Sequence, residues 1–152
     1  MTRSYRIAAL ALAVLLLLPV GVQAKSRGQT IYVPCYSHIY QGPRSRPLNL
    51  SVMLSVRNVD MVHSLTLTAV EYYDTNGKMV RSELPSPISL APLMTREFMV
   101  QTQDTSGGSG ANYIVKWLAE TPVNAPLVEA VMIGTQSGLG ISFVRQGRVL
   151  EE

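Results

Sequence analysis

The chain has 152 residues, of which 47% are hydrophobic, and a formal net charge of +3. Two of its basic residues, Arg3 and Arg6, lie within the first 24 positions, so the remaining 128 residues carry eleven basic and ten acidic side chains, a net charge of +1. These charges are scattered, and no basic run of the kind that neutralises phosphates is present. Composition therefore argues against nucleic acid as a partner, and the length predicts one domain.

The first 24 residues have the pattern of a signal peptide. Arg3 and Arg6 precede an unbroken apolar run over residues 7–18, and Val22-Gln23-Ala24 places small residues at a cleavage site. The run is about a dozen residues long, whereas a membrane-spanning helix needs roughly twenty. We therefore predict a cleaved signal peptide over residues 1–24, a mature domain over 25–152 in the periplasm or outside the cell, and no membrane span after cleavage. The alternative is an uncleaved anchor at the outer face of the membrane.

The first predicted strand carries the chain's single cysteine. Ile31, Val33 and Cys35 occupy alternate positions and so share one face of a strand. A lone cysteine forms no internal disulfide. We predict a small buried hydrophobe at Cys35; the alternative is a free or intermolecularly bridged thiol.

Aromatic side chains fill the opposite parity of the same segment. Tyr32, Tyr36, His38 and Tyr40 lie on one face if the strand continues straight through Pro34, and the last three are the candidate binding residues. Such a face is a candidate binding surface, and the alternative is a set of rings that cap the sandwich edge. Pro34 lacks an N–H, which favours an edge strand, and an edge strand is where a homodimer can form by backbone pairing.

Strand and turn patterns continue to the end of the chain. Residues 48–57 alternate apolar and polar side chains, Asn58-Val59-Asp60 predicts a turn, and Asn76-Gly77 predicts a hairpin. Further alternating or apolar runs lie at 65–69, 95–103, 113–119, 127–135 and 141–145. No segment has a sustained helical period. The pattern predicts an all-β fold, a single antiparallel β-sandwich of immunoglobulin or fibronectin-like type, with a small β-barrel as the alternative.

The glycine-rich loop over residues 104–112 is the most unusual local sequence. Asp104, Ser106 and Asn112 offer oxygen atoms to a cation, and the glycines allow backbone N–H groups to converge on an anion. Neither the phosphate-loop nor the EF-hand spacing is met, so a tightly turned connection is the competing interpretation.

Residues for catalysis are scarce in this chain. His38 and His63 are the two histidines, and no zinc-binding spacing is present. No serine lies in a G-x-S-x-G register. We therefore assign no catalytic residue, no metal ligand and no cofactor from the sequence.

Several short strings resemble one bacterial family, known as domain of unknown function 3124. The strings are Tyr32-Val33-Pro34, Tyr36-Ser37-His38-Ile39-Tyr40, Ser55-Val56-Arg57-Asn58, Tyr72-Tyr73-Asp74, residues 104–112, and Glu129-Ala130-Val131-Met132-Ile133-Gly134-Thr135. The resemblance runs from about Ile31 to Val149 and implies no activity, cofactor or catalytic residue. At position 35 the family usually has an aliphatic residue, which also favours a packing role for Cys35.

Two functions of different class remain at this stage. We expect a non-catalytic binding module of the cell envelope, with an unknown envelope protein or a glycan as its partner and a homodimer through an edge strand as its possible assembly. The alternative is a metal- or small-ligand-dependent protein or enzyme centred on the Asp104–Asn112 loop. That alternative requires His38 to lie near the loop in a concave pocket.

Overall fold

A computed structural model describes residues 25–136 and 138–152, and the predicted signal peptide lies outside this range. The described chain forms twelve strands and one short 3₁₀ turn, Gly108–Gly110. The strands are β1 (Ser26–Pro34), β2 (His38–Gln41), β3 (Arg46–Asn49), β4 (Ser51–Arg57), β5 (Leu65–Tyr73), β6 (Met79–Ser82), β7 (Ile88–Leu90), β8 (Thr95–Val100), β9 (Asn112–Val123), β10 (Leu127–Gln136), β11 (Leu139–Gln146) and β12 (Arg148–Glu151).

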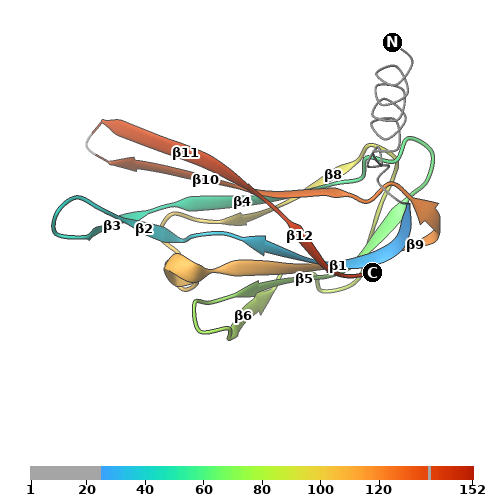
Figure 1. Ribbon diagram of the computed structural model, residues 1–152, viewed down its shortest axis with the longest axis horizontal. Coiled ribbons are helices and arrows are strands. Elements are labelled where there is room, and N and C mark those ends of the chain that lie inside the picture. The colour runs from blue at the N-terminus through green and yellow to red at the C-terminus, as the bar shows by residue number, and fades with distance from the viewer. Residues whose placement is uncertain (1–24, 137) are drawn as a thin grey trace, which may run out of the picture.

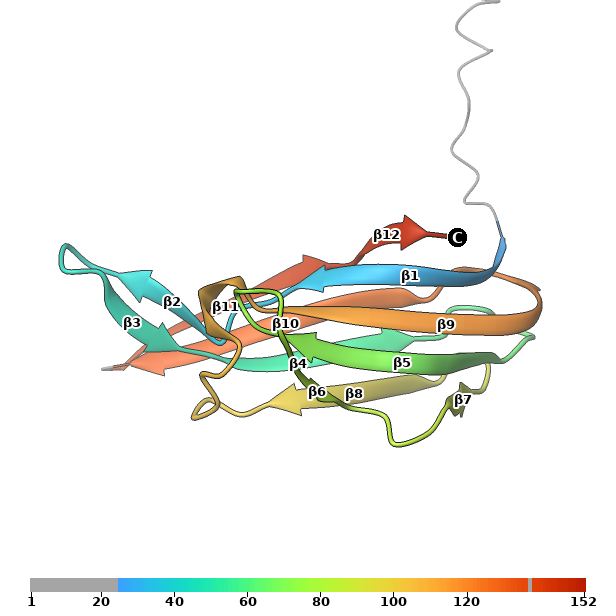
Figure 2. The same ribbon diagram turned by 90° about the horizontal axis from the view of Figure 1, so that it is seen from below.

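The strands form two stacked antiparallel sheets and one separate hairpin (Figures 1 and 2). The first sheet has the order β12-β1-β9-β5-β6, and β7 also pairs with β5. The second has the order β11-β10-β4-β8, and β2 pairs only with β3. Each sheet ends in edge strands over the described residues. The predicted antiparallel β-sandwich is therefore confirmed, and the alternative of a closed barrel is not adopted.

The core lies between the two sheets because alternate residues of each strand point inward. Val52, Leu54 and Val56 of β4 are fully buried, as the alternation over residues 48–57 predicts. Trp117 and Tyr113 of β9, in the other sheet, are buried in the same core cluster. No helix in the described part of the chain is long and apolar enough to cross a membrane.

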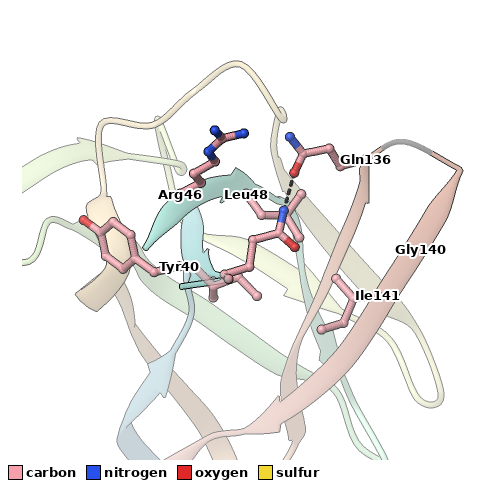
Figure 3. Close-up of a pocket in the computed structure, with 9 residues that line it drawn as sticks. Tyr40, Arg46, Leu48, Gln136, Gly140 and Ile141 are labelled. Atoms are coloured by element: carbon pink, nitrogen blue, oxygen red, sulfur yellow. Dashed lines mark hydrogen bonds between the residues drawn. The ribbon is translucent and has the colours of Figure 1, made fainter. Parts of the chain in front are cut away.

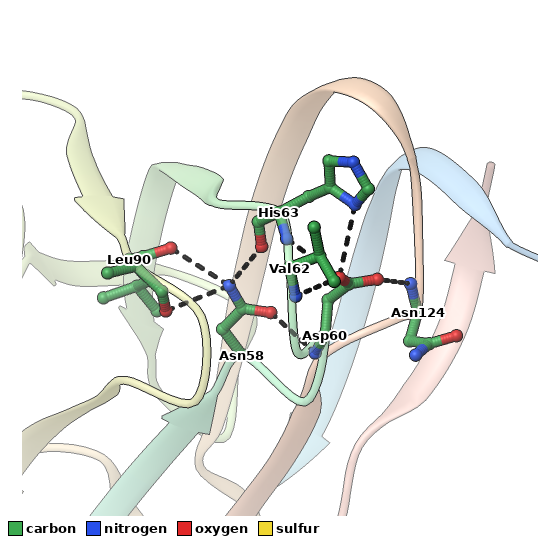
Figure 4. A network of polar contacts seen from close by, with 7 residues as sticks. Asn58, Asp60, Val62, His63, Leu90 and Asn124 are labelled. Atoms are coloured by element: carbon green, nitrogen blue, oxygen red, sulfur yellow. Dashed lines mark hydrogen bonds and ion pairs between the residues drawn. The ribbon is translucent and has the colours of Figure 1, made fainter.

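A polar network ties the turn after β4 to two distant segments (Figure 4). The Asn58 side-chain amide donates to the carbonyl oxygens of His63 at 2.9 Å, Leu90 at 3.1 Å and Ala91 at 3.0 Å. Asp60 accepts from the backbone N–H of Asn124, which lies in the crossing from β9 to β10. Backbone hydrogen bonds from Asn124, and then from His63 and Val62, hold the pKa of Asp60 well below its usual range. The predicted turn therefore connects three loops by hydrogen bonds: its own, the one after β7, and the one between β9 and β10.

Strand β1 departs from the prediction of an edge position. Its residues Thr30, Ile31 and Tyr32 pair with β12 on one side and with β9 on the other. The edge position was predicted from Pro34, and no strand was predicted over residues 148–151, which form β12. The prediction that β1 is an edge strand is therefore wrong at residues 30–32, where β12 pairs with it and makes it an internal strand.

The long strand predicted over residues 48–57 is also divided. β3 ends at Asn49 and β4 begins at Ser51, and between them the Leu50 N–H donates to the Ser37 carbonyl oxygen at 2.9 Å. The chain therefore leaves the sandwich after β1, forms the β2–β3 hairpin, and re-enters the second sheet at β4.

Candidate binding site

A pocket of about 560 Å³ lies between two hairpins that extend from the same end of the sandwich (Figures 1 and 3). One wall is the β2–β3 hairpin, in which Tyr40 pairs with Pro47, and the other is the end of the β10–β11 hairpin. Nine residues line it: Ile39, Tyr40, Gln41, Gly42, Arg46, Leu48, Gln136, Gly140 and Ile141. Of these nine residues, Tyr40 is the one that was predicted from the sequence as a binding residue.

Local sequence explains why both walls are hairpins. Gly42 and Ser45 have positive φ angles of 68° and 48°, and the Ser45 N–H donates to the Gly42 carbonyl oxygen at 3.1 Å. Gly138 has a φ of 80° in the turn between β10 and β11. Gly42 and Gly138 adopt these angles without steric cost, so each turn has a glycine where the chain reverses. A side-chain hydrogen bond from Gln41 to Gln136 joins the two hairpins across the pocket (Figure 3).

The chemistry of the pocket is amphipathic. Ile39, Leu48 and Ile141 provide apolar surface, and Gln41 and Gln136 provide amides. Arg46 is the charged residue among the described residues that line the pocket, and it forms none of the ion pairs found in the described chain. An apolar surface beside one unpaired guanidinium suits a ligand that carries both an apolar group and a carboxylate.

The predicted aromatic face is split by the end of β1. The His38 and Tyr40 rings stay together, with centroids 5.2 Å apart in an edge-to-face arrangement and the Tyr40 hydroxyl 3.3 Å from His38 Nε2. The Tyr36 ring instead packs against Phe143, with centroids 5.8 Å apart, and is partly buried against the core. The prediction of one aromatic face required a single strand that runs through Pro34 to Tyr40. It is wrong because β1 ends at Pro34 and β2 begins at His38, and Tyr36 lies in the link between them.

The Asp104–Asn112 loop is built into the packing of the sandwich. The Arg81 guanidinium donates to Asp104 Oδ2 at 2.7 Å, and the Ser106 backbone N–H donates to Asp104 Oδ1 at 3.1 Å. Partial burial alone would raise the pKa of Asp104, but hydrogen bonds from Ser106 and Arg81 outweigh it and hold the pKa below its usual value. Both carboxylate oxygens therefore already have donors. Asn112 begins β9 and pairs with Pro34 and Tyr73.

The carbonyl oxygens of the loop are also engaged. The Thr75 N–H and hydroxyl both donate to the Gly107 oxygen, at 2.9 Å and 3.1 Å. The Ser37 N–H and hydroxyl both donate to the Gly108 oxygen at 3.0 Å. The loop thus lies beside Ser37, next to His38 in the chain, but neither His38 nor the loop lines the pocket between the hairpins. Across the described ranges, no three His, Cys, Asp or Glu side chains gather as metal ligands do.

Comparison with known proteins identifies the family. The model of the family described as "Protein of unknown function (DUF3124)" matches residues 28–150. The chain belongs to the DUF3124 family. Its expected membership is confirmed, and the match covers both hairpins of the pocket.

Other comparisons add little to this DUF3124 chain. No curated protein matches it. A solved structure described as "Crystal Structure of Thermotoga maritima 1070" is similar with a TM-score of 0.49 and 9% sequence identity, over 81% of this chain and 95% of that one.

Sequence reasoning missed most of the pocket of this DUF3124 domain. Leu48 and Ile141 lie in runs that were predicted as strands without any function, and Gln136 lies just after such a run. Ile39 lies between two residues of the predicted aromatic face but was not itself singled out. The Gly42-Pro43 dipeptide between two short apolar runs is a turn signal that predicts the first hairpin. No local signal brings that hairpin next to residues 136–141, because the contact joins segments about a hundred residues apart.

Cys35 is buried, as predicted from its strand face. It is 0% exposed, and burial raises the pKa of its thiol to about 12. We expect the native chain in mildly alkaline buffer to react with a thiol-specific chromogenic reagent far more slowly than the same chain unfolded in guanidinium. Absorbance of the released chromophore measures both rates, and equal rates would contradict the packing role.

Proposed function

We propose that this DUF3124 protein is an exported, non-catalytic binding module of the cell envelope that holds a segment of a partner protein in the pocket between its two hairpins. The observation that carries the proposal is the apolar pocket with one unpaired guanidinium at its wall. An apolar side chain of the partner fits the surface of Ile39, Leu48 and Ile141, and a carboxylate beside it fits Arg46.

Support for export comes from residues 1–24. The two arginines, the short apolar run and the small residues before Lys25 are the features of a cleaved signal. The DUF3124 match begins at residue 28, just after the predicted cleavage site. A periplasmic or secreted location follows from cleavage, and a domain of this kind meets envelope proteins there.

Support for a binding role over catalysis comes from the side chains of the two candidate regions. The pocket is lined by amides, apolar groups, a phenol and a guanidinium, and a guanidinium stays protonated and does not serve as a general base. Both carboxylate oxygens of Asp104 accept hydrogen bonds within the fold, from Arg81 and from the Ser106 N–H, and the Ser106 hydroxyl donates to the same carboxylate. The alternative centred on that loop therefore gains no support from its geometry. An apolar pocket surface also favours a protein segment over a glycan, which needs a denser set of polar groups.

A cross-linked pull-down from the envelope of the native host tests this function. The full chain carries a C-terminal affinity tag, and the variants are Arg46→Glu and Tyr40→Ala. Arg44→Glu is the matched control, because Arg44 is an exposed arginine of the same hairpin turn that does not line the pocket. We expect recovery of the partner to fall about tenfold or more with Arg46→Glu, which reverses the charge that the partner meets, and to stay unchanged with Arg44→Glu.

Equal recovery by wild type and both arginine variants would contradict the pocket as the binding site. Loss of signal after glycosidase treatment, but not after protease treatment, would identify a glycan and overturn the protein partner. The N-terminal residue of the recovered chain, read by mass spectrometry, tests export in the same sample, where we expect Lys25. Tyr36 is left unchanged in these variants because its ring packs against Phe143.

A further inference from the structure

Two buried polar groups on neighbouring strands have no hydrogen-bond partner among the described residues. One is a donor, the indole Nε1–H of Trp117 in β9, and the other is an acceptor, the side-chain Oε1 of Gln29 in β1. Trp117 is 1% exposed and Gln29 is 7% exposed. Buried polar groups in proteins are nearly always hydrogen-bonded, to protein or to water, because an unpaired group loses its solvation without compensation. An unpaired donor and an unpaired acceptor in one region therefore point to a molecule that bonds to both.

The two side chains lie next to each other on one face of the first sheet. Gln29 and Trp117 are directly opposite in the antiparallel pairing of β1 with β9, and the Cβ atoms of opposite residues are about 4.5–5.5 Å apart. Ile31 and Val115 are the next pair on the same face, and both are buried in the core cluster. The donor and the acceptor do not bond to each other. One oxygen atom between them, about 2.9 Å from each, would satisfy both.

The Glu152 side chain determines which atom of the Gln29 amide is unpaired. Gln29 Nε2 donates to Glu152 Oε1 at 3.0 Å. If the amide group were turned over, its oxygen would face this carboxylate, and two acceptors repel each other. Oε1 therefore stays on the other side of the amide group, where the described part of the chain offers it no donor.

Gln29 borders two openings of the fold that are large enough for small molecules. The first has a volume of about 390 Å³ and is lined by both Gln29 and Trp117, together with Thr30 and Lys116 among others. The second has a volume of about 270 Å³ and is lined by Gln29 with Gly147 and others. A water molecule takes up about 30 Å³ in the liquid, so each opening has room for water or for a small polyol.

We propose that the fold holds a hydroxyl oxygen between the Trp117 Nε1–H and Gln29 Oε1. This oxygen accepts from the indole and donates its own hydrogen to the amide oxygen, so one O–H group satisfies both. An ammonium group has no acceptor for the indole N–H, and an ionised carboxylate has no hydrogen for the amide oxygen. Water supplies the required chemistry, and so does an alcohol group of a small polyol. Neither residue lines the pocket between the hairpins, so the site is independent of the proposed function.

Nuclear magnetic resonance of the full chain tests the site through the indole N–H of Trp117, which gives one signal because the chain has one tryptophan. Water is excited selectively, and magnetisation transfer to the indole hydrogen is read in the rotating frame, where direct transfer and proton exchange have opposite signs. We expect direct transfer from water in the wild type. Glycerol is then added as the polyol probe. Transfer from its carbon-bound hydrogens, with matching loss of the transfer from water, would identify a polyol alcohol as the source of the hydroxyl.

Removal of the acceptor assigns the second half of the site. Gln29→Met keeps a side chain of similar length without an amide oxygen, and it should lose the transfer to the indole N–H because the hydroxyl then has one partner fewer. Gln103→Met is the matched control, since Gln103 is exposed in the loop between β8 and β9, and it should leave the transfer unchanged. Gln29→Leu repeats the test if the methionine variant does not fold. A wild-type indole N–H that receives transfer from neither water nor glycerol would overturn the site, and transfer that persists in the Gln29 variants would overturn Gln29 as the acceptor.

Discussion

Replacement of Asn58 by alanine is expected to lower the free energy of unfolding by about 4 kcal/mol. Asn58 is 1% exposed, and its amide group donates to three carbonyl oxygens while its Oδ1 accepts the Asp60 N–H at 2.9 Å. Alanine leaves these groups without their partners, and the Leu90 carbonyl oxygen and the Asp60 N–H make theirs in a buried place. The turn after β4 and the segment at Leu90 and Ala91, which the amide joins, would then lose this contact.

Urea denaturation followed by the fluorescence of Trp117 measures this effect, because Trp117 is the single tryptophan and is buried in the core. Asn58→Asp should be at least as destabilising as alanine, because its carboxylate would face three carbonyl oxygens in place of the amide N–H groups. Asn124→Ala is the control, since only the backbone of Asn124 joins this network, and we expect a change within about 0.5 kcal/mol. An aspartate variant as stable as wild type would show that the Asn58 amide donors do not contribute to the free energy of unfolding.

Gly107→Ala is expected to destabilise the fold by about 3 kcal/mol. A Cβ at this position would overlap the Tyr72 hydroxyl and lie 2.5 Å from Tyr72 Cζ and 2.7 Å from the Ala111 Cβ. Gly107 has a φ of −74°, so the cost is one of space and not of backbone conformation. The Tyr72 ring has no room to retreat, because it packs against Tyr113 at 4.9 Å and under the Arg81 guanidinium at 4.7 Å.

A second substitution separates this clash from a general loss of the loop. The Tyr72 hydroxyl is buried and has no hydrogen-bond partner among the described residues, so Tyr72→Phe alone should leave stability nearly unchanged. In the double variant, removal of the hydroxyl should recover part of the stability that Gly107→Ala loses. Gly140→Ala is the control glycine, because the nearest atom to its Cβ lies 3.9 Å away. Full additivity of the two substitutions in the same urea experiment would contradict the steric cause.

Local patterns predicted the parts of this fold in which one face is buried. Residues 48–57 and 113–119 alternate because burial of every second side chain is what a sandwich strand requires, and Val52, Val56 and Trp117 are buried as expected. The Asn76-Gly77 turn formed for a local reason as well, since Gly77 has a φ of 77°. Strand β12 was missed because its residues are exposed and have no alternation to detect.

Local sequence patterns predicted less of the candidate site than of the fold. Tyr40 was singled out for its aromatic neighbours and does line the pocket, whereas Tyr36 was grouped with it and packs against Phe143. Asp104 was named for its glycine-rich loop, but its ion pair with Arg81 comes from a strand about twenty residues earlier. Both partners, Phe143 and Arg81, come from other segments of the chain. The sequence pattern does not show that these segments pack together.

By itself, the sequence of this protein determined the class of fold, the family and the buried place of Cys35. These properties follow from the period of apolar residues and from the residues in the strand itself, which act over a few positions of the chain. Only the tertiary structure decided that two hairpins enclose a pocket, that β1 is covered by β12, and that Gln29 and Trp117 lie opposite each other with their polar groups buried. Each of these depends on the register between strands far apart in the chain, and that register is set by the packing of the whole sandwich.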